Sequence, residues 1–194
     1  QAPLRKLLKQ LKRERKLAFA VLTDTLKGRR YLKLLARLQA WLREPGFTPM
    51  GEEPIAAWWP ELQQPVLAGL FTLPAWWADN PYDPQVVDGL HQLRRRLKRA
   101  RYGLANLACF QPEAFSPWLE QLKALQAVLG DLQDLVVLEQ TLARLLDGAP
   151  DAVMPSFCSL LAEARDRNWM LWLERSAVLR TAEGRQGLLQ LQQG

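Results

Sequence analysis

The chain has 194 residues, of which 48% are apolar and 24% charged, and this length and composition are typical of a protein with a buried core. They exclude a disordered basic tail, and no apolar run approaches the roughly 18 residues of a transmembrane helix. The net charge of +6 is concentrated, because residues 1–30 carry ten Lys/Arg against two acidic residues and residues 89–102 carry six Lys/Arg and no acidic residue. This pattern suggests a polyanionic partner.

Two helices are predicted in the first part of the chain. Leu, Lys, Arg and Ala at helical spacing predict a helix from Leu4 to about Leu26, and a second helix from Arg30 to Arg43 ends at Glu-Pro-Gly. Four basic residues of the first helix form a straight stripe about 16 Å long at 1.5 Å per residue: Arg5, Lys9, Lys12 and Lys16. The sequence lacks the glycine-rich loop of a nucleotide site, so the stripe favours an extended ligand with regularly repeating charge.

The middle of the chain is predicted to be a Pro/Gly-rich connection over residues 45–60, followed by an interrupted helix over residues 61–78. Tryptophan pairs at residues 58–59 and 76–77 lie near the breaks and away from the basic segments. We therefore expect them to pack in the core or at bundle ends. A surface for a partner protein over residues 55–78 is the alternative.

Three long helices are predicted in the rest of the chain, over residues 85–109, 115–147 and 155–182. A short final turn is expected within residues 184–194. No segment alternates with period two, so we predict no strands and assign the chain to the all-α class, as antiparallel helical bundles. Cys109 and Cys158 are not spaced as a CxxC pair, and we expect both to be buried free thiols in a reducing, cytoplasmic compartment. We expect no metal site and no cofactor.

The predicted helix over residues 85–109 is charged on one side only. At about 100° per residue its apolar residues share one face: Leu90, Leu93, Leu97, Ala100, Leu104 and Leu107. The opposite face gathers the only histidine of the chain, four cations and a tyrosine: His91, Arg94, Arg95, Lys98, Arg101 and Tyr102. Such cations repel one another, and no acidic residue interleaves with them as it would on a face built for solubility. We therefore predict an outward-pointing face that binds an anion, with a plain solvated face as the alternative.

The predicted helix over residues 115–147 aligns a second set of residues on one face: Lys123, Gln126, Gly130, Asp134 and Val137. Glycine in a helix interior costs about 1 kcal/mol relative to alanine. We therefore expect Gly130 to allow close approach of a neighbouring helix or of a ligand chain. Asp134 either pairs with a basic residue across the helix interface or is an exposed polar residue.

The segment HQLRRRLKRARY, residues 91–102, followed by LQAVLGDLQDLVVL, residues 125–138, resembles the CHAD (conserved histidine α-helical domain) family. That family has a helix reading His-x-x-Arg-x-x-x-Lys-x-x-Arg-Tyr and then a helix with Lys-x-x-Gln-x-x-Leu-Gly and an acid four residues later. The matching residues are His91, Arg94, Lys98, Arg101, Tyr102, Lys123, Gln126, Leu129, Gly130 and Asp134. Residues 7–42 are also similar to the family, whereas the family's acid three residues after the tyrosine is Ala105 here.

The resemblance implies two pseudo-symmetric helical bundles side by side, which bind inorganic polyphosphate without catalysis and occur at polyphosphate granules. We expect residues 1–80 to be the remainder of the first half and residues 81–194 to be the second. The first half would be incomplete, because the chain begins with Gln1 and the first His/Arg-rich helix would lie upstream. The expected polyphosphate-binding residues are Arg5, Lys9, Lys12, Lys16, Arg30, His91, Arg94, Arg95, Lys98, Arg101, Tyr102 and Lys123, supported by Gln126, Gly130 and Asp134.

We expect these cations to line up into one exposed track. Arginines would engage phosphate oxygens with two donors each, and lysines would act as point charges. His91 either donates a hydrogen bond to phosphate or is a neutral histidine bonded to the backbone at the helix start. Tyr102 either supplies its hydroxyl to phosphate or a neighbouring side chain, or packs in the core.

A helical nucleic-acid-binding protein is the alternative function. It would interleave aromatic residues with the basic stripes, and Tyr102 alone does so. An enzyme that acts on phosphate chains would need clustered carboxylates for a metal, and Asp131 with Asp134 is a sparse set. We therefore expect a binding protein without catalytic activity and without a membrane partner.

Overall fold

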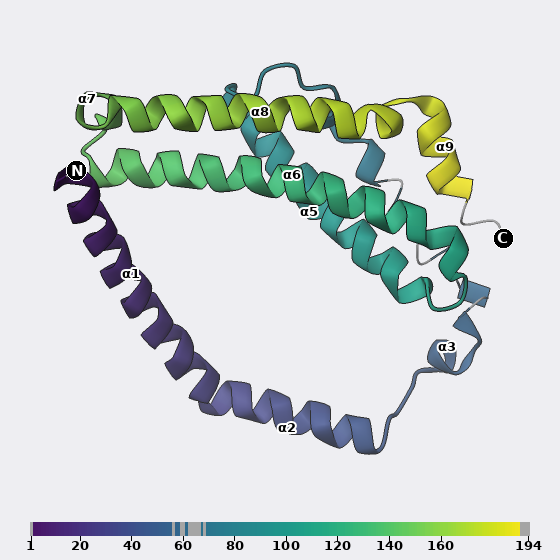
Figure 1. The fold of residues 1–194 in the computed structure, drawn as a ribbon. Helices are drawn as coiled ribbons and strands as arrows, with labels where there is room; N and C mark the ends of the chain where they lie inside the picture. Colours follow the sequence, from purple (N-terminus) through teal and green to yellow (C-terminus); the bar gives the residue numbers. More distant parts are fainter. Residues whose placement is uncertain (1, 56, 59–60, 62–66, 68, 191–194) are drawn as a thin grey trace. The chain divides into compact units, whose positions relative to one another are not determined.

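The computed structural model describes residues 2–55, 57–58, 61, 67 and 69–190. These residues form helices joined by turns and loops, with no strand among them, so the all-α class is confirmed (Figure 1). By backbone contacts the chain divides into two compact units, residues 1–55 and residues 56–194. The division into pseudo-symmetric halves after residue 80 stays a prediction.

The first unit contains α1 (Ala2–Lys27), α2 (Arg29–Arg43) and the short α3 (Pro49–Glu52). Gly28 separates α1 from α2, since its extended backbone (φ −68°, ψ 148°) forms the N-cap of α2. Both predicted helices and the predicted break between them are therefore confirmed. No residue of α2 is buried, and most residues of α1 are also exposed.

The second unit contains η1 (Pro74–Trp77), α5 (Pro84–Leu107), α6 (Pro112–Leu145), α7 (Pro150–Val153), α8 (Pro155–Arg180) and α9 (Ala182–Gln190). α6 contacts both α5 and α8, and Figure 1 shows α6 and α8 running antiparallel. The three long helices match the predicted ones to within a few residues at each end, whereas the four-residue α7 was not predicted. Of the interrupted helix expected over residues 61–78, residues 62–66 and 68 lie outside the described residues, and its described end is broken at residues 72–73, before η1.

The ends of α5 and α6 are set by local side-chain and backbone chemistry. The Asp83 carboxylate accepts a hydrogen bond of 2.7 Å from the backbone N–H of Gln85, which caps the start of α5. At the C-terminal end of α6, Asp147 has a left-handed backbone (φ 54°). The backbone N–H of Gly148 donates a hydrogen bond of 2.8 Å to the carbonyl of Ala143. This is the Schellman arrangement, which satisfies carbonyls left over at a helix end and turns the chain toward α8.

The core of the second unit buries the predicted apolar face of α5 in full: Leu90, Leu93, Leu97, Ala100, Leu104 and Leu107. α6 contributes the facing layer, which includes Phe115, Leu122, Leu125, Val128, Leu129 and Leu132. Trp76 closes one end of the core, since its ring lies 5.5 Å from that of Trp172 and its Nε1 donates to the carbonyl of Leu70 at 2.8 Å. Burying one such large apolar side chain contributes about 1.5–3 kcal/mol. This packing fixes which side of α5 faces outward.

The tryptophans confirm the core prediction in part. Trp76, Trp169 and Trp172 are buried, whereas Trp77 is 51% exposed and carries the guanidinium of Arg185 at 4.6 Å from its ring centre. Trp59 lies outside the described residues. The pair at residues 76–77 therefore has one ring in the core and one at its edge.

The two cysteines are free, as predicted, but they are not both buried. Cys109 is exposed because it follows the last turn of α5, where its thiol donates to the carbonyl of Asn106 at 3.4 Å. Cys158 is half-buried, and burial followed by a hydrogen bond to Asp151 raises the pKa of its thiol. Among the described residues, no helix is both long enough and apolar enough to span a bilayer.

Candidate anion-binding face

The basic face of α5 meets solvent along one edge and α6 along the other. Arg95 and Lys98 are exposed, whereas His91, Arg94 and Arg101 are half-buried. The half-buried three are spaced i, i+3 and i+10, which places them on neighbouring positions of the helix surface. The prediction that this whole face points outward is therefore corrected, because three of its members lean onto α6.

Two of these side chains are held by glutamine amides of α6. Nδ1 of His91 lies 3.0 Å from Oε1 of Gln133, and Nε of Arg101 donates to Oε1 of Gln126 at 2.9 Å. An amide oxygen can only accept a hydrogen bond, so Nδ1 of His91 is the donor and Nε2 is left for another partner. The alternative expectation, that His91 bonds the backbone at the helix start, is wrong, because its Nδ1 contacts the side chain of Gln133.

The third side chain, Arg94, lies over Gly130. A Cβ atom built on Gly130 would be 3.5 Å from Nε and 3.6 Å from Nη2 of Arg94. The expected close approach at Gly130 is therefore made by an arginine side chain of the neighbouring helix. Nε of Arg94 is buried and has no hydrogen-bond partner among the described residues, so its guanidinium is held by packing.

All three α6 partners are uncharged. Within the described part of the chain, no carboxylate forms an ion pair with His91, Arg94 or Arg101. Arg165 of α8 differs, because it is 7% exposed and its guanidinium pairs with the carboxylate of Glu139. A buried cation that only supports the fold is normally neutralised in this way. Arg94 and Arg101 are oriented but keep their full charge for an external anion. We call this set, His91, Arg94 and Arg101 with their α6 partners, the cation seam.

Tyr102 lies beside the cation seam and is 50% exposed, which excludes the core alternative. Its ring centre is 4.5 Å from Cζ of Arg101 and 5.8 Å from Nζ of Lys98. The electron-rich face of an aromatic ring attracts such cations. The ring therefore gathers two positive side chains at the C-terminal end of the seam.

Two predicted residues of α6 lie apart from these contacts. Lys123 forms an ion pair of 3.3 Å with Glu120, and both side chains are mostly exposed, so the pair contributes about 0–1 kcal/mol. Asp134 is exposed and makes no ion pair with any described residue, so the exposed-polar alternative holds. Asp134 lies four residues after Gly130, on the same side of α6, but it forms no ion pair with the basic side chains of the seam.

Gln133 was not among the predicted site residues, although its side chain contacts His91. It follows Gln126 by seven residues, two helical turns, so both amides lie on nearly the same line of α6. This i, i+7 repeat of an amide opposite a basic helix was the signal available in the sequence.

The predicted basic residues of the first unit are all exposed: Arg5, Lys9, Lys12 and Lys16 on α1, and Arg30 on α2. Their alignment with the cation seam into one track stays a prediction. Among the described residues, no three His, Cys, Asp or Glu side chains are grouped so as to hold a metal ion.

Comparison with protein families finds a match of residues 1–143 to the model described as the CHAD domain. The comparisons with curated proteins and with solved structures returned no significant match.

Proposed function

Because the match spans residues 1–143 of 194, the chain belongs to the CHAD domain family, and we propose that it binds inorganic polyphosphate along the cation seam. The family is known in general for binding polyphosphate. The observation that carries the proposal is the neutral contact made by each half-buried basic side chain of α5, at Gln126, Gly130 and Gln133. Those contacts fix side-chain positions without cancelling charge.

The length of the seam suits an extended polyanion. His91 and Arg101 are ten residues apart, about 15 Å along α5 at 1.5 Å per residue. Arg94 and Arg101 can offer two donors each to phosphate oxygens, and His91 in its protonated form would add a donor at Nε2. The polymer would displace counterions as it binds, so affinity should fall steeply with salt concentration.

We propose that basic residues outside the cation seam also contact the polymer. Arg95, Lys98 and Tyr102 lie at its exposed edge, Lys123 lies on α6, and the first unit adds a second basic stripe: Arg5, Lys9, Lys12, Lys16 and Arg30. We further propose a cytoplasmic protein at polyphosphate granules that binds the polymer without cleaving it, since both follow from the family resemblance.

A charge reversal on α5 tests the binding site. We expect Arg94→Glu with Lys98→Glu to weaken binding of long-chain polyphosphate by more than about tenfold, because two attractive contacts become repulsive. The matched control is Arg167→Glu with Arg175→Glu, the same charge change at exposed positions of α8. Circular dichroism checks that helicity is kept. Equal losses in both double variants would leave only a net-charge effect and overturn the site.

A competition assay tests the ligand. Polyphosphate, DNA and RNA of equal charge are titrated at two salt concentrations, and released phosphate is measured with magnesium present. Preference for polyphosphate without release of phosphate is the expected result. Preference for nucleic acid overturns the proposal, and phosphate release shows a catalytic activity instead.

Nucleic-acid binding is the second candidate, and the half-exposed ring of Tyr102 between two cations is the observation that favours it. Stacking of a base on such a ring contributes about 1–3 kcal/mol. Tyr102→Leu would then reduce affinity for single-stranded nucleic acid at least tenfold. Polyphosphate has no bases, so its affinity should change far less.

A further inference from the structure

A small cavity lies between α5, α6 and α8, directly behind His91. It leaves about 10 Å³ for the centre of a water-sized sphere. Its walls are mainly apolar, but three polar side chains reach it: His91, Gln133 and Arg165. A cavity with this much room holds one water molecule, provided that polar groups line it.

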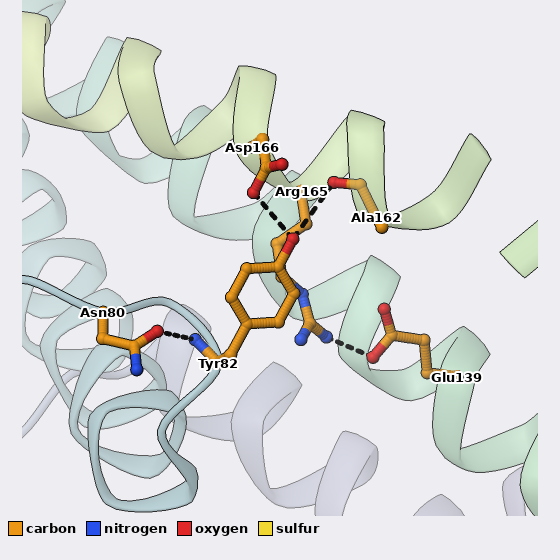
Figure 2. Close-up of polar contacts among 6 residues, drawn as sticks. All are labelled: Asn80, Tyr82, Glu139, Ala162, Arg165 and Asp166. Atoms are coloured by element: carbon orange, nitrogen blue, oxygen red, sulfur yellow. Dashed lines mark hydrogen bonds and ion pairs between the residues drawn. The ribbon is translucent and has the colours of Figure 1, made fainter. Parts of the chain in front are cut away.

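Arg165 is the side chain that makes the cavity polar. Its Nη2 pairs with the Glu139 carboxylate, and Figure 2 shows the Tyr82 ring beside the guanidinium, whose Cζ is 4.9 Å from the ring centre. The Tyr82 hydroxyl donates to Oδ1 of Asp166 at 2.6 Å, which fixes the ring (Figure 2). Nε of Arg165 is buried and has no hydrogen-bond partner among the described residues.

Such an N–H needs an acceptor. Leaving a buried donor without one costs about 1–3 kcal/mol, more when the group is charged, and most buried polar groups in folded proteins are therefore paired. Glu139 meets the guanidinium at Nη2, and the Tyr82 ring covers its face, so neither supplies an acceptor to Nε. Arg165 also lines the cavity, so the cavity is a place where an acceptor for Nε can lie.

Gln133 offers the second contact. Its Oε1 accepts from Nδ1 of His91, and an amide oxygen has a second lone pair. We infer that one ordered water molecule occupies the cavity, accepts from Nε of Arg165 and donates to Oε1 of Gln133. The water joins the ion pair between Arg165 of α8 and Glu139 of α6 to the amide that orients His91. This inference concerns the interior and is independent of what the cation seam binds.

A substitution that fills the cavity tests whether the cavity contains a water molecule. Val136 of α6 also lines the cavity, and Val136→Ile adds one methylene group. In a dry cavity the extra group improves packing and raises the melting temperature or leaves it unchanged. Where it expels a bound water, Nε of Arg165 loses its acceptor, and we expect the melting temperature to fall by about 2–4 °C.

The control repeats this substitution in a Gln133→Leu background, where the water has lost its acceptor. There Val136→Ile should no longer lower the melting temperature. A rise or no change in the otherwise native protein overturns the inference. An equal fall in both backgrounds also overturns it, because overpacking alone explains that result.

Crystallography of the native protein provides a readout that does not depend on variants. A water peak within about 3 Å of both Nε of Arg165 and Oε1 of Gln133 is expected in a high-resolution map. An empty cavity there overturns the inference even if the thermal shifts agree with it.

Discussion

Nε of Arg101 donates a hydrogen bond of 2.9 Å to Oε1 of Gln126, so a half-buried cation of α5 is held by a neutral amide of α6. Ordering a free arginine side chain costs up to about 2 kcal/mol of rotamer entropy. When that ordering is done in the folded protein, a ligand that binds later avoids much of the cost. A carboxylate would order the side chain equally well but would cancel its charge.

Gln126→Glu tests this distinction between order and charge. The new carboxylate keeps the contact with Arg101 and strengthens it, so we expect unchanged or slightly raised thermal stability. Affinity for polyphosphate should fall about three- to tenfold, because one cation of the seam is neutralised. Isothermal titration at low salt measures the affinity.

Gln140→Glu is the matched control for Gln126→Glu. Gln140 is exposed on the same helix, 14 residues and about 21 Å further along. It makes the same change in net charge at about two Debye lengths from the contact between Gln126 and Arg101, since the Debye length is about 10 Å at 0.1 M salt. An equal loss of affinity in the two variants at that ionic strength would show that Gln126 has no special role.

Two substitutions of Gly130 should have different effects on polyphosphate binding. A Cβ at 3.5 Å from Arg94 is in ordinary contact, so Gly130→Ala should fit and raise stability by about 0.5–1 kcal/mol through helix propensity, with binding kept. The larger side chain of Gly130→Leu would occupy the place of the guanidinium. It should weaken polyphosphate binding while the helix is maintained. Loss of binding in Gly130→Ala would contradict this account.

The apolar face of α5 was predicted in full because helical periodicity alone decides which positions are buried. The lean of Arg94 and Arg101 onto α6 was not predicted. A helical projection gives an angle around one axis, but a long side chain reaches sideways, and its direction depends on what the neighbouring helix offers. Gln133 was missed for the same reason, since its role exists only once α5 and α6 are packed. The prediction that Cys109 is buried was wrong, because the exposure of a thiol in the turn after a helix depends on the residue at which that helix ends.

Tyr82→Phe gives a pH-dependent prediction. Partial burial and then the hydrogen bond to Asp166 raise the pKa of Tyr82 from 10.0 to about 12. The unfolded chain therefore loses this proton first as pH rises. The stabilising effect of the hydroxyl is complete below about pH 10 and is lost between pH 10 and 12.

Urea unfolding measures this effect. At pH 8 the variant should be less stable by about 1 kcal/mol, and the difference should shrink as pH rises toward 12. Tyr102→Phe is the control, because the Tyr102 hydroxyl makes no hydrogen bond with a described residue and its removal should change stability little at either pH. A difference for Tyr82→Phe that is constant with pH would contradict the raised pKa.

Gly184 should respond to alanine in the direction opposite to Gly130. It lies at the corner between α8 and α9, where a Cβ atom would overlap the carbonyl oxygen of Val178. The backbone N–H of Gly184 also donates to Oγ1 of Thr181 at 3.0 Å, so the corner cannot shift freely. Gly184→Ala should therefore lower stability by about 1–3 kcal/mol.

Gly103→Ala on α5 is the control, because no described atom lies within 4 Å of its Cβ and the substitution should stabilise. Thermal unfolding of both variants decides the matter, and a stabilised Gly184→Ala would mean that the corner is looser than its contacts indicate.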